Sequence, residues 1–490
     1  MRQLFKELAR DFVRRVEPRA PRRDCASSGP IWRTEGTVRG PLQKAVMKKY
    51  ILAVLLVLSP SLHAQTTLER AVQIQTQVNA LVASLSVPPP IDVPAGGNLQ
   101  AALDGAPAGA VVRLTAGATY PGTVILRTSN VTLTTMATLP VGRIDPSNAA
   151  LLPKLQNIQT VAGVHHVSLV GLEITNSGSD LVRLGDGSSA QTLLSQVPHD
   201  LLVDRCYIHG DPSLGAKRGI ALNSASTTIQ NSYISDIKLQ GTDTQAIAGW
   251  NGPGPFTITN NYLEGMTENV MFGGADSAIP NLVPCDITVT NNWLNKPLSM
   301  RGLGWQVKNL FELKNACRVE VSGNTLTGSW GDAQTGYAFV LTPRNQDGHA
   351  PWSTVNTVNI HDNTIAHVAA VLDIQGTDDP PKVSGTTTAV TFAHNTATDV
   401  DPWGYAGSDK LFLVLSGPVD LVIDANTITG QHIGSELYFD VLPKALRMRF
   451  TNNVMPTSTY GIKGSGFASG LASWNGYVDS GTVSGNTPAP

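Results

Sequence analysis

The acidic and basic side chains with the clearest chemical potential lie in short apolar segments in the middle of the chain. In "LFELKN" the two-residue periodicity of a strand turns Glu312 and Lys314 to the same outer side. Arg344 follows in "LTPRNQDG", and Glu268 and Asp276 precede both segments. Abstraction of a proton from carbon needs a base near neutral pH and positive charge, from side chains or Ca²⁺, to stabilise the developing anion. We therefore predict that Lys314 and Arg344 are catalytic.

The three carboxylates of this group, Glu268, Asp276 and Glu312, could bind calcium, although the chemistry requires no cofactor. Trp250, Asn251, Asn345 and Gln346 lie in the same segments and are predicted to bind substrate. The alternative for Glu312 and Lys314 is a surface ion pair without a catalytic role.

A six-residue pattern, apolar-x-x-Asn-x-apolar, indicates the elements that position these side chains. Its nine copies are spaced by 26 to 39 residues, a scale typical of solenoids. Their period of two and their Val, Ile, Thr and Tyr content indicate strands. A second apolar segment, such as "AFVLT" (338–342), lies between copies. The copies are "VDRCYI" (203–208), "IQNSYI" (229–234), "ITNNYL" (258–263), "VTNNWL" (289–294), "VSGNTL" (321–326), "IHDNTI" (360–365), "FAHNTA" (392–397), "IDANTI" (423–428) and "FTNNVM" (450–455).

The fourth position of the pattern predicts a ladder of inward asparagines. Equivalent residues of successive coils should stack about 4.8 Å apart, so their amides can satisfy the backbone groups of the turns. Cys206 and Ser232 occupy the same position in the first two copies. The asparagines are Asn261, Asn292, Asn324, Asn363, Asn395, Asn426 and Asn453.

Cys285 and Cys317 each lie four residues before the first apolar position of adjacent copies. Their Cα atoms should therefore approach to about 5 Å, which is within the range of a disulfide. We predict a disulfide or a stacked thiol pair at these positions.

The fifth position holds aromatic residues in four consecutive copies, Tyr207, Tyr233, Tyr262 and Trp293. These rings should stack on an outer face, where Tyr262 and Trp293 could pack against sugar rings. The alternative is that they form the floor beneath a long turn.

The amino-terminal part of the chain differs in composition from the repeats. We interpret residues 1–46 as an extension upstream of the native start and residues 47–64 as a signal peptide, with a basic start, an apolar stretch and the small residue Ala64 before cleavage. Nine apolar residues are too few to span a bilayer, so no stable membrane span is expected after cleavage; a retained anchor is the alternative. Residues 65–94 are predicted to form a helix and a Pro-rich linker, and the protein to be secreted or periplasmic.

Short strands, turns rich in Gly, Asn and Asp, and coils of about 30 residues are the format of a parallel β-helix. On these repeats the chain resembles the right-handed parallel β-helix superfamily of pectate lyases, over roughly residues 95–480, and we assign 95–490 to this all-β domain. The stretch "LLVDRCYIHGD" (201–211) has Arg205 where those lyases carry histidine, and their Arg-x-Pro-x-x-Arg signature is absent. Of the patterns of related glycoside hydrolases, only the pair Asp378 and Asp379 is present.

The resemblance implies a secreted protein that acts on an acidic polysaccharide, and β-elimination is the reaction that the charged residues favour. A non-catalytic β-helix that binds glycan or builds a cell-surface structure is the alternative, as is a glycoside hydrolase. The net charge of −2 gives no support for nucleic-acid binding, which requires a basic face.

Overall fold

The computed structural model describes residues 72–77 and 88–488. Contacts divide the chain into two units, Met1–Ser86 and Val87–Pro490. In the first unit, residues 72–77 are helical and lie within the helix predicted for 65–94. The upstream extension and the signal peptide predicted for 1–46 and 47–64 lie outside the described residues. Within the described ranges, no helix combines the length and hydropathy needed to cross a membrane.

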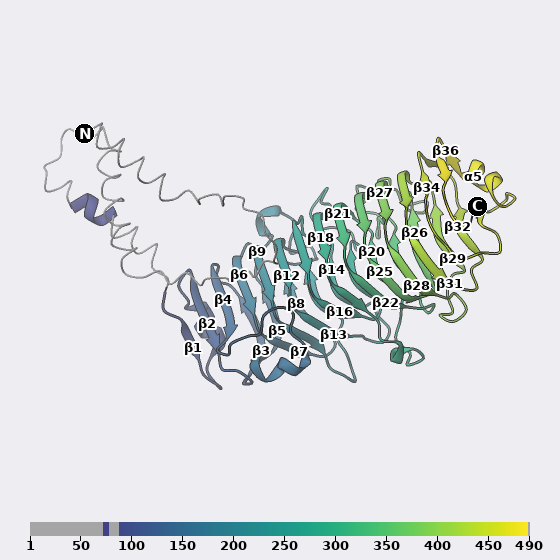
Figure 1. Ribbon diagram of the computed structural model, residues 1–490. Helices are drawn as coiled ribbons and strands as arrows, with labels where there is room; N and C mark the ends of the chain where they lie inside the picture. The colour runs from purple at the N-terminus through teal and green to yellow at the C-terminus, as the bar shows by residue number, and fades with distance from the viewer. Residues whose placement is uncertain (1–71, 78–87, 489–490) are drawn as a thin grey trace, which may run out of the picture. The chain divides into compact units, whose positions relative to one another are not determined.

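The second unit is a solenoid of parallel strands that stack into three faces (Figure 1). The first face begins with the amino-terminal strand of the solenoid and continues to its carboxyl-terminal end. Its strands are β1 (Ile91–Val93), β2 (Ala110–Leu114), β4 (Val131–Thr135), β6 (His165–Val170), β9 (His199–Asp204), β12 (Ala225–Gln230), β15 (Phe256–Thr259), β18 (Cys285–Thr290), β21 (Ala316–Ser322), β24 (Val355–His361), β27 (Thr388–Ala393), β30 (Val419–Asp424), β33 (Ala445–Leu446), β34 (Arg449–Thr451), β36 (Val478–Asp479) and β37 (Thr482–Ser484).

The second and third faces begin from two long strands, β3 (Thr119–Leu126) and β5 (Lys154–Thr160). The second face contains β7 (Glu173–Asn176), β10 (Tyr207–Gly210), β13 (Tyr233–Ile237), β16 (Tyr262–Gly265), β19 (Trp293–Asn295), β22 (Thr325–Ser329), β25 (Thr364–Val368), β28 (Thr396–Val400) and β31 (Thr427–Gly430). The third face contains β8 (Asp180–Leu184), β11 (Arg218–Leu222), β14 (Gln245–Gly249), β17 (Glu268–Phe272), β20 (Asn309–Leu313), β23 (Tyr337–Leu341), β26 (Ala370–Gln375), β29 (Lys410–Leu415), β32 (Ser435–Asp440) and β35 (Ile462–Gly464).

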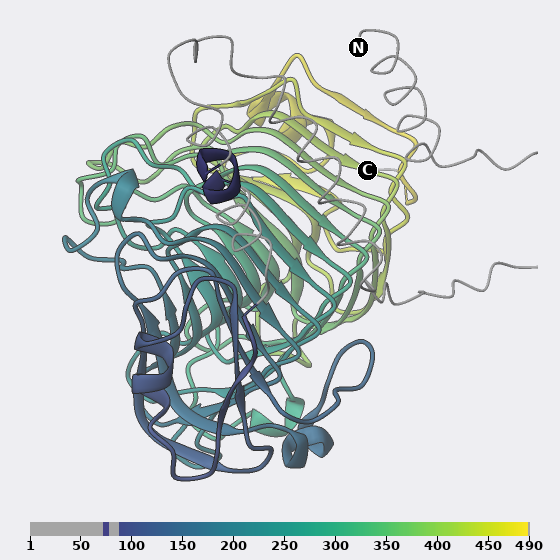
Figure 2. The ribbon, with the colours of Figure 1, turned by 90° about the vertical axis from the view of Figure 1, so that its left-hand side faces the viewer.

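From β6 to β32 each coil contributes one strand to each face, and neighbouring coils pair in parallel. The chain is therefore a right-handed parallel β-helix, which confirms the predicted all-β solenoid. Figure 2 shows the coils stacked behind one another. Short helices lie at the two ends, α4 (Leu99–Asp104) and α5 (Leu471–Tyr477), and 3₁₀ turns lie in loops, η1 (Pro146–Leu151), η2 (Leu194–Gln196) and η3 (Leu298–Met300).

The asparagine ladder forms at the turn from the first face to the second. The Asn292 N–H donates to Asn324 Oδ1 at 2.9 Å, and the Asn324 N–H donates to Asn363 Oδ1 at 3.0 Å. The Asn324 amide nitrogen also donates to Val289 O at 2.8 Å. The same bonds continue from Ser232 to Asn486, one coil beyond the last predicted copy, so buried turn groups are paired along the solenoid.

The residue before each ladder position has a left-handed backbone. Asn260, Asn291 and Asn452 have φ values of 54°, 57° and 59°. Asparagine tolerates this conformation better than most residues because its short side chain can bond locally. The repeated pair of asparagines thus combines a turn residue with a ladder residue.

The core is a continuous stack of apolar side chains inside the coils. Phenylalanines meet at 5.5 to 6.0 Å between ring centroids, as in the pairs Phe256–Phe272 and Phe392–Phe412. Cys206 is buried and free, and burial raises the pKa of its thiol to about 12. Side chains alternate between the two sides of a strand. The residues between these inward apolar side chains therefore point outward.

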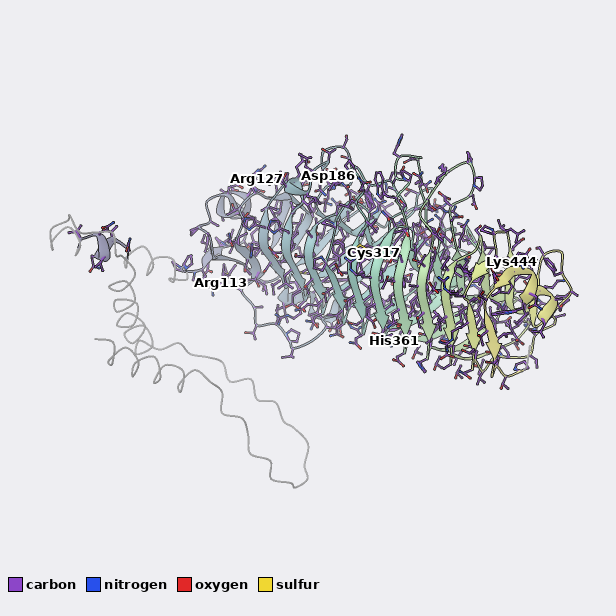
Figure 3. The ribbon with its side chains drawn as sticks, turned by 90° about the horizontal axis from the view of Figure 1, so that it is seen from above. Arg113, Arg127, Asp186, Cys317, His361 and Lys444 are labelled. Carbon is purple, nitrogen blue, oxygen red and sulfur yellow. A yellow bond between two sulfur atoms is a disulfide. The ribbon has the colours of Figure 1, made fainter. Side chains whose placement is uncertain are left out.

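Cys285 and Cys317 form the predicted disulfide between neighbouring strands β18 and β21. Their Cα atoms are 4.5 Å apart, and the two residues are in register. Figure 3, which labels Cys317, shows it midway along the solenoid.

Candidate active site

The outer side of the third face carries most of the charged residues that the sequence analysis selects. Chain segments 238–244, 296–308, 330–336 and 401–409 enter this face, and segments 250–255, 273–284, 342–354 and 376–387 leave it. Loops therefore flank its strands at both edges. We define the charged cluster as Glu268, Lys308, Glu312, Lys314, Arg344 and Asp373.

Glu268 lies on β17 and is only 1% exposed. Its Oε2 accepts a hydrogen bond from Gln245 Nε2 at 2.7 Å, and Lys308 Nζ lies 3.6 Å from its Oε1. Burial, reinforced by the charge of Glu312, raises the pKa of Glu268 to about 8. Lys308 in turn pairs with Asp243 at 2.5 Å, so it joins the floor of the face to the loop 238–244.

Glu312 and Lys314 form an ion pair on β20 and the residue after it. Lys314 Nζ lies 2.9 Å from Glu312 Oε1, and Asn309 Nδ2 donates to Glu312 Oε2 at 3.2 Å. Burial opposes the ionisation of Glu312, but the Lys314 ammonium and the amide outweigh it and lower the pKa of Glu312. The Glu312 carboxylate is fully buried, whereas the Lys314 side chain is 15% exposed. Lys314 is thus a cation held at the surface by a buried anion.

Arg344 lies beside Lys314 on the neighbouring coil, as predicted. Its backbone N–H donates to Lys314 O at 2.9 Å. Its Nη1 pairs with Asp378 and, at 3.1 Å, with Asp379. These bonds raise the pKa of Arg344 against the opposing effect of burial. Within the described residues, Nε and Nη2 have no hydrogen-bond partner, so they remain as donors for a ligand.

Asp373 completes the cluster, and the sequence did not single it out. It lies on β26, in the same outward column as Glu312 and two coils further along, about 9.6 Å away between Cα atoms. The residue is partly exposed, but its Oδ1 is buried and has no hydrogen-bond partner among the described residues. Burial and the charge of Glu312 raise the pKa of Asp373 to about 7, although Arg344 and Lys314 partly offset them. The available signal was one acidic residue in the apolar strand "AVLDIQ".

The three carboxylates predicted to bind calcium do not fit a calcium site. Glu268 and Glu312 are buried and face Lys308 and Lys314. Asp276 lies in the loop 273–284, where its Oδ2 accepts the backbone N–H groups of two residues of the loop 342–354, at 3.0 and 2.8 Å. No group of three or more His, Cys, Asp or Glu residues in the described chain has metal-binding geometry.

Of the polar residues predicted to bind substrate, two are structural instead. Asn251 is fully buried; its Nδ2 donates to Asp186 O and Gln191 O, both at 2.9 Å. Asn345 is 3% exposed, and its Nδ2 donates to Val383 O at 2.8 Å. Both amides hold loops together, so the predicted substrate contacts are wrong for these two residues.

Trp250 and Gln346 remain accessible. Gln346 is exposed at the tip of the loop 342–354. Trp250 is partly exposed, with the Arg218 guanidinium 5.0 Å from its ring centroid and its indole N–H donating to Gly187 O at 2.9 Å.

The aromatic column forms on the second face with the predicted register. Tyr233 and Tyr262 stack at 4.2 Å between centroids, and Trp293 meets Tyr262 edge to face at 5.1 Å. Tyr262 is only 5% exposed and bonds Glu264 Oε2 at 2.9 Å, so its predicted sugar contact is wrong. Trp293 is 40% exposed and keeps an open surface.

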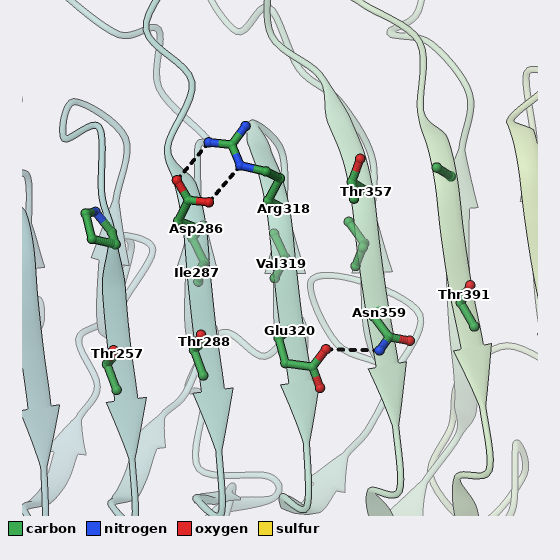
Figure 4. Close-up of a pocket in the computed structure, with 13 residues that line it drawn as sticks. Thr257, Asp286, Ile287, Thr288, Arg318, Val319, Glu320, Thr357, Asn359 and Thr391 are labelled. Carbon is green, nitrogen blue, oxygen red and sulfur yellow. Dashed lines mark hydrogen bonds and ion pairs between the residues drawn. The ribbon is translucent and has the colours of Figure 1, made fainter.

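A shallow groove of about 660 Å³ lies on the first face, across β15 to β27 (Figure 4). Arg318 there forms a two-bond ion pair with Asp286, both at 2.7 Å, and Glu320 accepts from Asn359 Nδ2 at 3.0 Å. Both ion-pair partners are more than half exposed, and threonines and apolar side chains make up most of the rest of the groove. The groove lies on a different face from the charged cluster and has no comparable set of buried ionisable groups.

A comparison with one solved structure supports the fold, and two more distant structures are similar to the chain. PfbA, a surface adhesin of Streptococcus pneumoniae, is similar over 75% of this chain and 86% of its own, with a TM-score of 0.51 and 12% identity. The catalytic unit of a GH87 α-1,3-glucanase from Streptomyces thermodiastaticus covers 79% of this chain and 65% of its own at 15% identity, with a TM-score of 0.43. An alginate lyase from Paenibacillus covers 76% of this chain and 98% of its own at 11% identity, with a TM-score of 0.36. These likenesses concern the fold alone.

No protein-family model matches the chain, and no curated protein matches it in sequence.

Proposed function

We propose that this protein cleaves an acidic polysaccharide by β-elimination and that the charged cluster is its active site. One observation carries the proposal: a partly exposed carboxyl with a pKa of about 7, Asp373, lies near two cations, Lys314 and Arg344. Titratable groups with such shifts, set by burial and neighbouring charge, gather at functional sites.

Each residue has a role in this reaction. The Lys314 ammonium and the open donors of Arg344 bind the uronate carboxylate and stabilise the negative charge that develops on it. The Asp373 carboxylate takes the proton next to that carboxylate; the electron pair forms a carbon–carbon double bond, and the glycosidic oxygen leaves and takes a proton from solvent. In this assignment Lys314, in its ion pair with Glu312, is a charge partner of the substrate, and Asp373 is the base.

Elimination is favoured over hydrolysis by the accessibility of the carboxylates. Glycoside hydrolases usually require two carboxyl groups that both reach the sugar. Within the charged cluster, Glu268 and Glu312 are 1% and 0% exposed, which leaves Asp373 as its one accessible carboxylate.

Binding without cleavage is the second candidate. The partly exposed Trp250 and Trp293 favour it, because tryptophan rings offer apolar surface to sugars. The fold similarity to a surface adhesin is compatible with this function, and a glucanase and a lyase share the fold too. A secreted or periplasmic location is part of both candidates.

The test is a screen of pectin, alginate and glycosaminoglycans with the full chain. Elimination creates a double bond that absorbs near 235 nm, whereas hydrolysis releases reducing ends without this absorbance. We expect absorbance to rise with one glycan, faster as pH increases through about 7, and Lys314→Ala to suppress it at least 100-fold. Lys444→Ala is the matched control, since this lysine lies outside the charged cluster and bonds Asn475 O. Reducing ends without absorbance would establish hydrolysis, and binding without either product would establish the second candidate.

A further inference from the structure

Trp403 is the most exposed tryptophan in the described part of the chain, at 74%. It lies in the loop 401–409 between β28 and β29. Its ring stacks on the imidazole of His432, from the next coil, at 4.2 Å between centroids and 9° between planes. One side of the indole is therefore supported, and the other is open to solvent.

A single carboxylate fixes both rings of this stack. Asp401 Oδ1 accepts the backbone N–H of Trp403 at 3.1 Å and that of Gly404 at 2.9 Å. The same oxygen lies 2.9 Å from His432 Nδ1, and Oδ2 accepts from Gln431 Nε2 at 2.7 Å. These donors hold the pKa of Asp401 at about 2 against the opposing effect of burial. The backbone of Trp403 and the imidazole beneath its ring are thus held by the same ionised group.

The loop that carries Trp403 is attached to its neighbours. Arg301 Nη2 donates to Gly404 O at 2.8 Å, and the Arg301 guanidinium lies 5.3 Å from the ring centroid of Tyr405. At the other end of the loop, Ser408 Oγ is 2.9 Å from the Tyr337 hydroxyl. Tyr337 begins β23 on the third face, where the charge of Asp373 acts on it. The loop therefore enters the third face beside the charged cluster.

We propose that Trp403 is a sugar-binding subsite, in which one pyranose ring of the polysaccharide packs its C–H face on the open side of the indole. This inference rests on the proposed function and adds a binding position to it. A rigid aromatic ring loses little conformational entropy when it binds a ligand. Gln431 and His432 bond the same carboxylate through one nitrogen each, and their other polar atoms, Oε1 and Nε2, can bond sugar hydroxyls.

A sugar fits this surface better than a protein partner does. In the loop 401–409, no other large apolar side chain is exposed, and Tyr405 is 8% exposed. Protein interfaces bury a contiguous patch of about 800 Å² on each partner. One supported ring bordered by polar groups matches a single sugar.

The experiment measures binding and cleavage of polygalacturonate, alginate and hyaluronan by the full chain and by Trp403→Ala. We expect Kd and KM to rise about 3- to 10-fold, with kcat changed less than twofold, because stacking holds the substrate equally before and during the reaction. Trp403→Phe should restore part of the loss. His432→Ala should weaken binding less, since it removes the support and leaves the ring. Tyr460→Ala, which removes another half-exposed aromatic, is the control.

The two proposals can fail separately. If the wild type binds a glycan without cleaving it and Trp403→Ala binds it less, elimination is wrong and the subsite stands. If the wild type cleaves a glycan and Trp403→Ala has Kd and KM within twofold of it, the subsite is overturned and elimination stands. No binding of the three glycans by the wild type overturns the subsite.

Discussion

The same coils form two contrasting regions, the turn with the asparagine ladder and the outer side of the third face. The two regions differ in how far their buried polar groups are paired. In the ladder, Asn324 bonds both neighbouring coils and a backbone carbonyl. On the third face, one oxygen of Asp373 has no hydrogen-bond partner among the described residues, and Glu268 has a pKa raised to about 8. The ladder minimises the free energy of the fold, whereas the third face keeps ionisable groups in unfavourable surroundings. Such local conflict is typical of functional sites.

The largest expected effect concerns the third face. Asp373→Asn should lower kcat on a cleaved glycan by 100-fold or more, because general base catalysis contributes about 10²- to 10⁴-fold. The amide keeps the shape of the side chain but accepts no proton at neutral pH. Initial rates of the absorbance change near 235 nm measure it.

The matched control is Asp440→Asn on β32, whose Oδ1 accepts the Val441 N–H at 2.9 Å and can be replaced by an amide oxygen. It should retain full activity. Equal rates for Asp373→Asn and the wild type would remove Asp373 from the mechanism.

The next effect tests the ladder. Asn324→Ala should lower the free energy of unfolding by about 2 to 4 kcal/mol, because it leaves buried groups of Asn292 and Val289 without partners. Denaturant unfolding measures the change. Asn291→Gly in the adjoining turn position, with φ of 57°, should cost less than about 1 kcal/mol, since glycine adopts this conformation freely. Equal losses in both variants would mean that the ladder bonds are not what stabilises the turn.

The regularity that makes the ladder stable also made it predictable. Equivalent residues of successive coils predicted the strands, the inward asparagines and the Cys285–Cys317 bridge. Coils that stack in register place such residues next to one another. The pairing of Lys314 with Glu312 could be predicted from strand alternation on one coil.

The predictions that failed depended on loop packing or on contacts between coils. Asn251 and Asn345 are of a residue type that can bind substrate, but loop packing buries them. Tyr262 is outward by periodicity, yet its neighbours cover it. The raised pKa of Asp373 depends on burial and on Glu312, two coils away, which no local pattern shows.

A smaller effect compares stability at two pH values. The folded pKa of Asp373 is raised to about 7 from an ordinary value of 3.8, so its contribution to stability is present below pH 3.8 and is lost as pH rises through 7. Asparagine does not ionise, so Asp373→Asn removes this pH-dependent loss of stability. The variant should therefore be more stable than the wild type at pH 8, on the order of 2 kcal/mol after allowance for partial exposure, and similar to it near pH 4. A constant difference in unfolding midpoint between these pH values would contradict the shift.

The smallest expected effect is that of chelation, and it asks whether the charged cluster is complete without a metal. Glu268 and Glu312 already face Lys308 and Lys314, and Asp276 accepts two backbone N–H groups elsewhere. Dialysis against EDTA should therefore leave both kcat/KM and the thermal midpoint unchanged within error, because the ammonium groups supply the charge that calcium would supply. A loss of activity that Ca²⁺ restores and Mg²⁺ does not would show that these carboxylates rearrange around an ion when substrate binds. In that case the carboxylates of the third face would have partners, as the amides of the ladder do, and the contrast between the two regions would disappear.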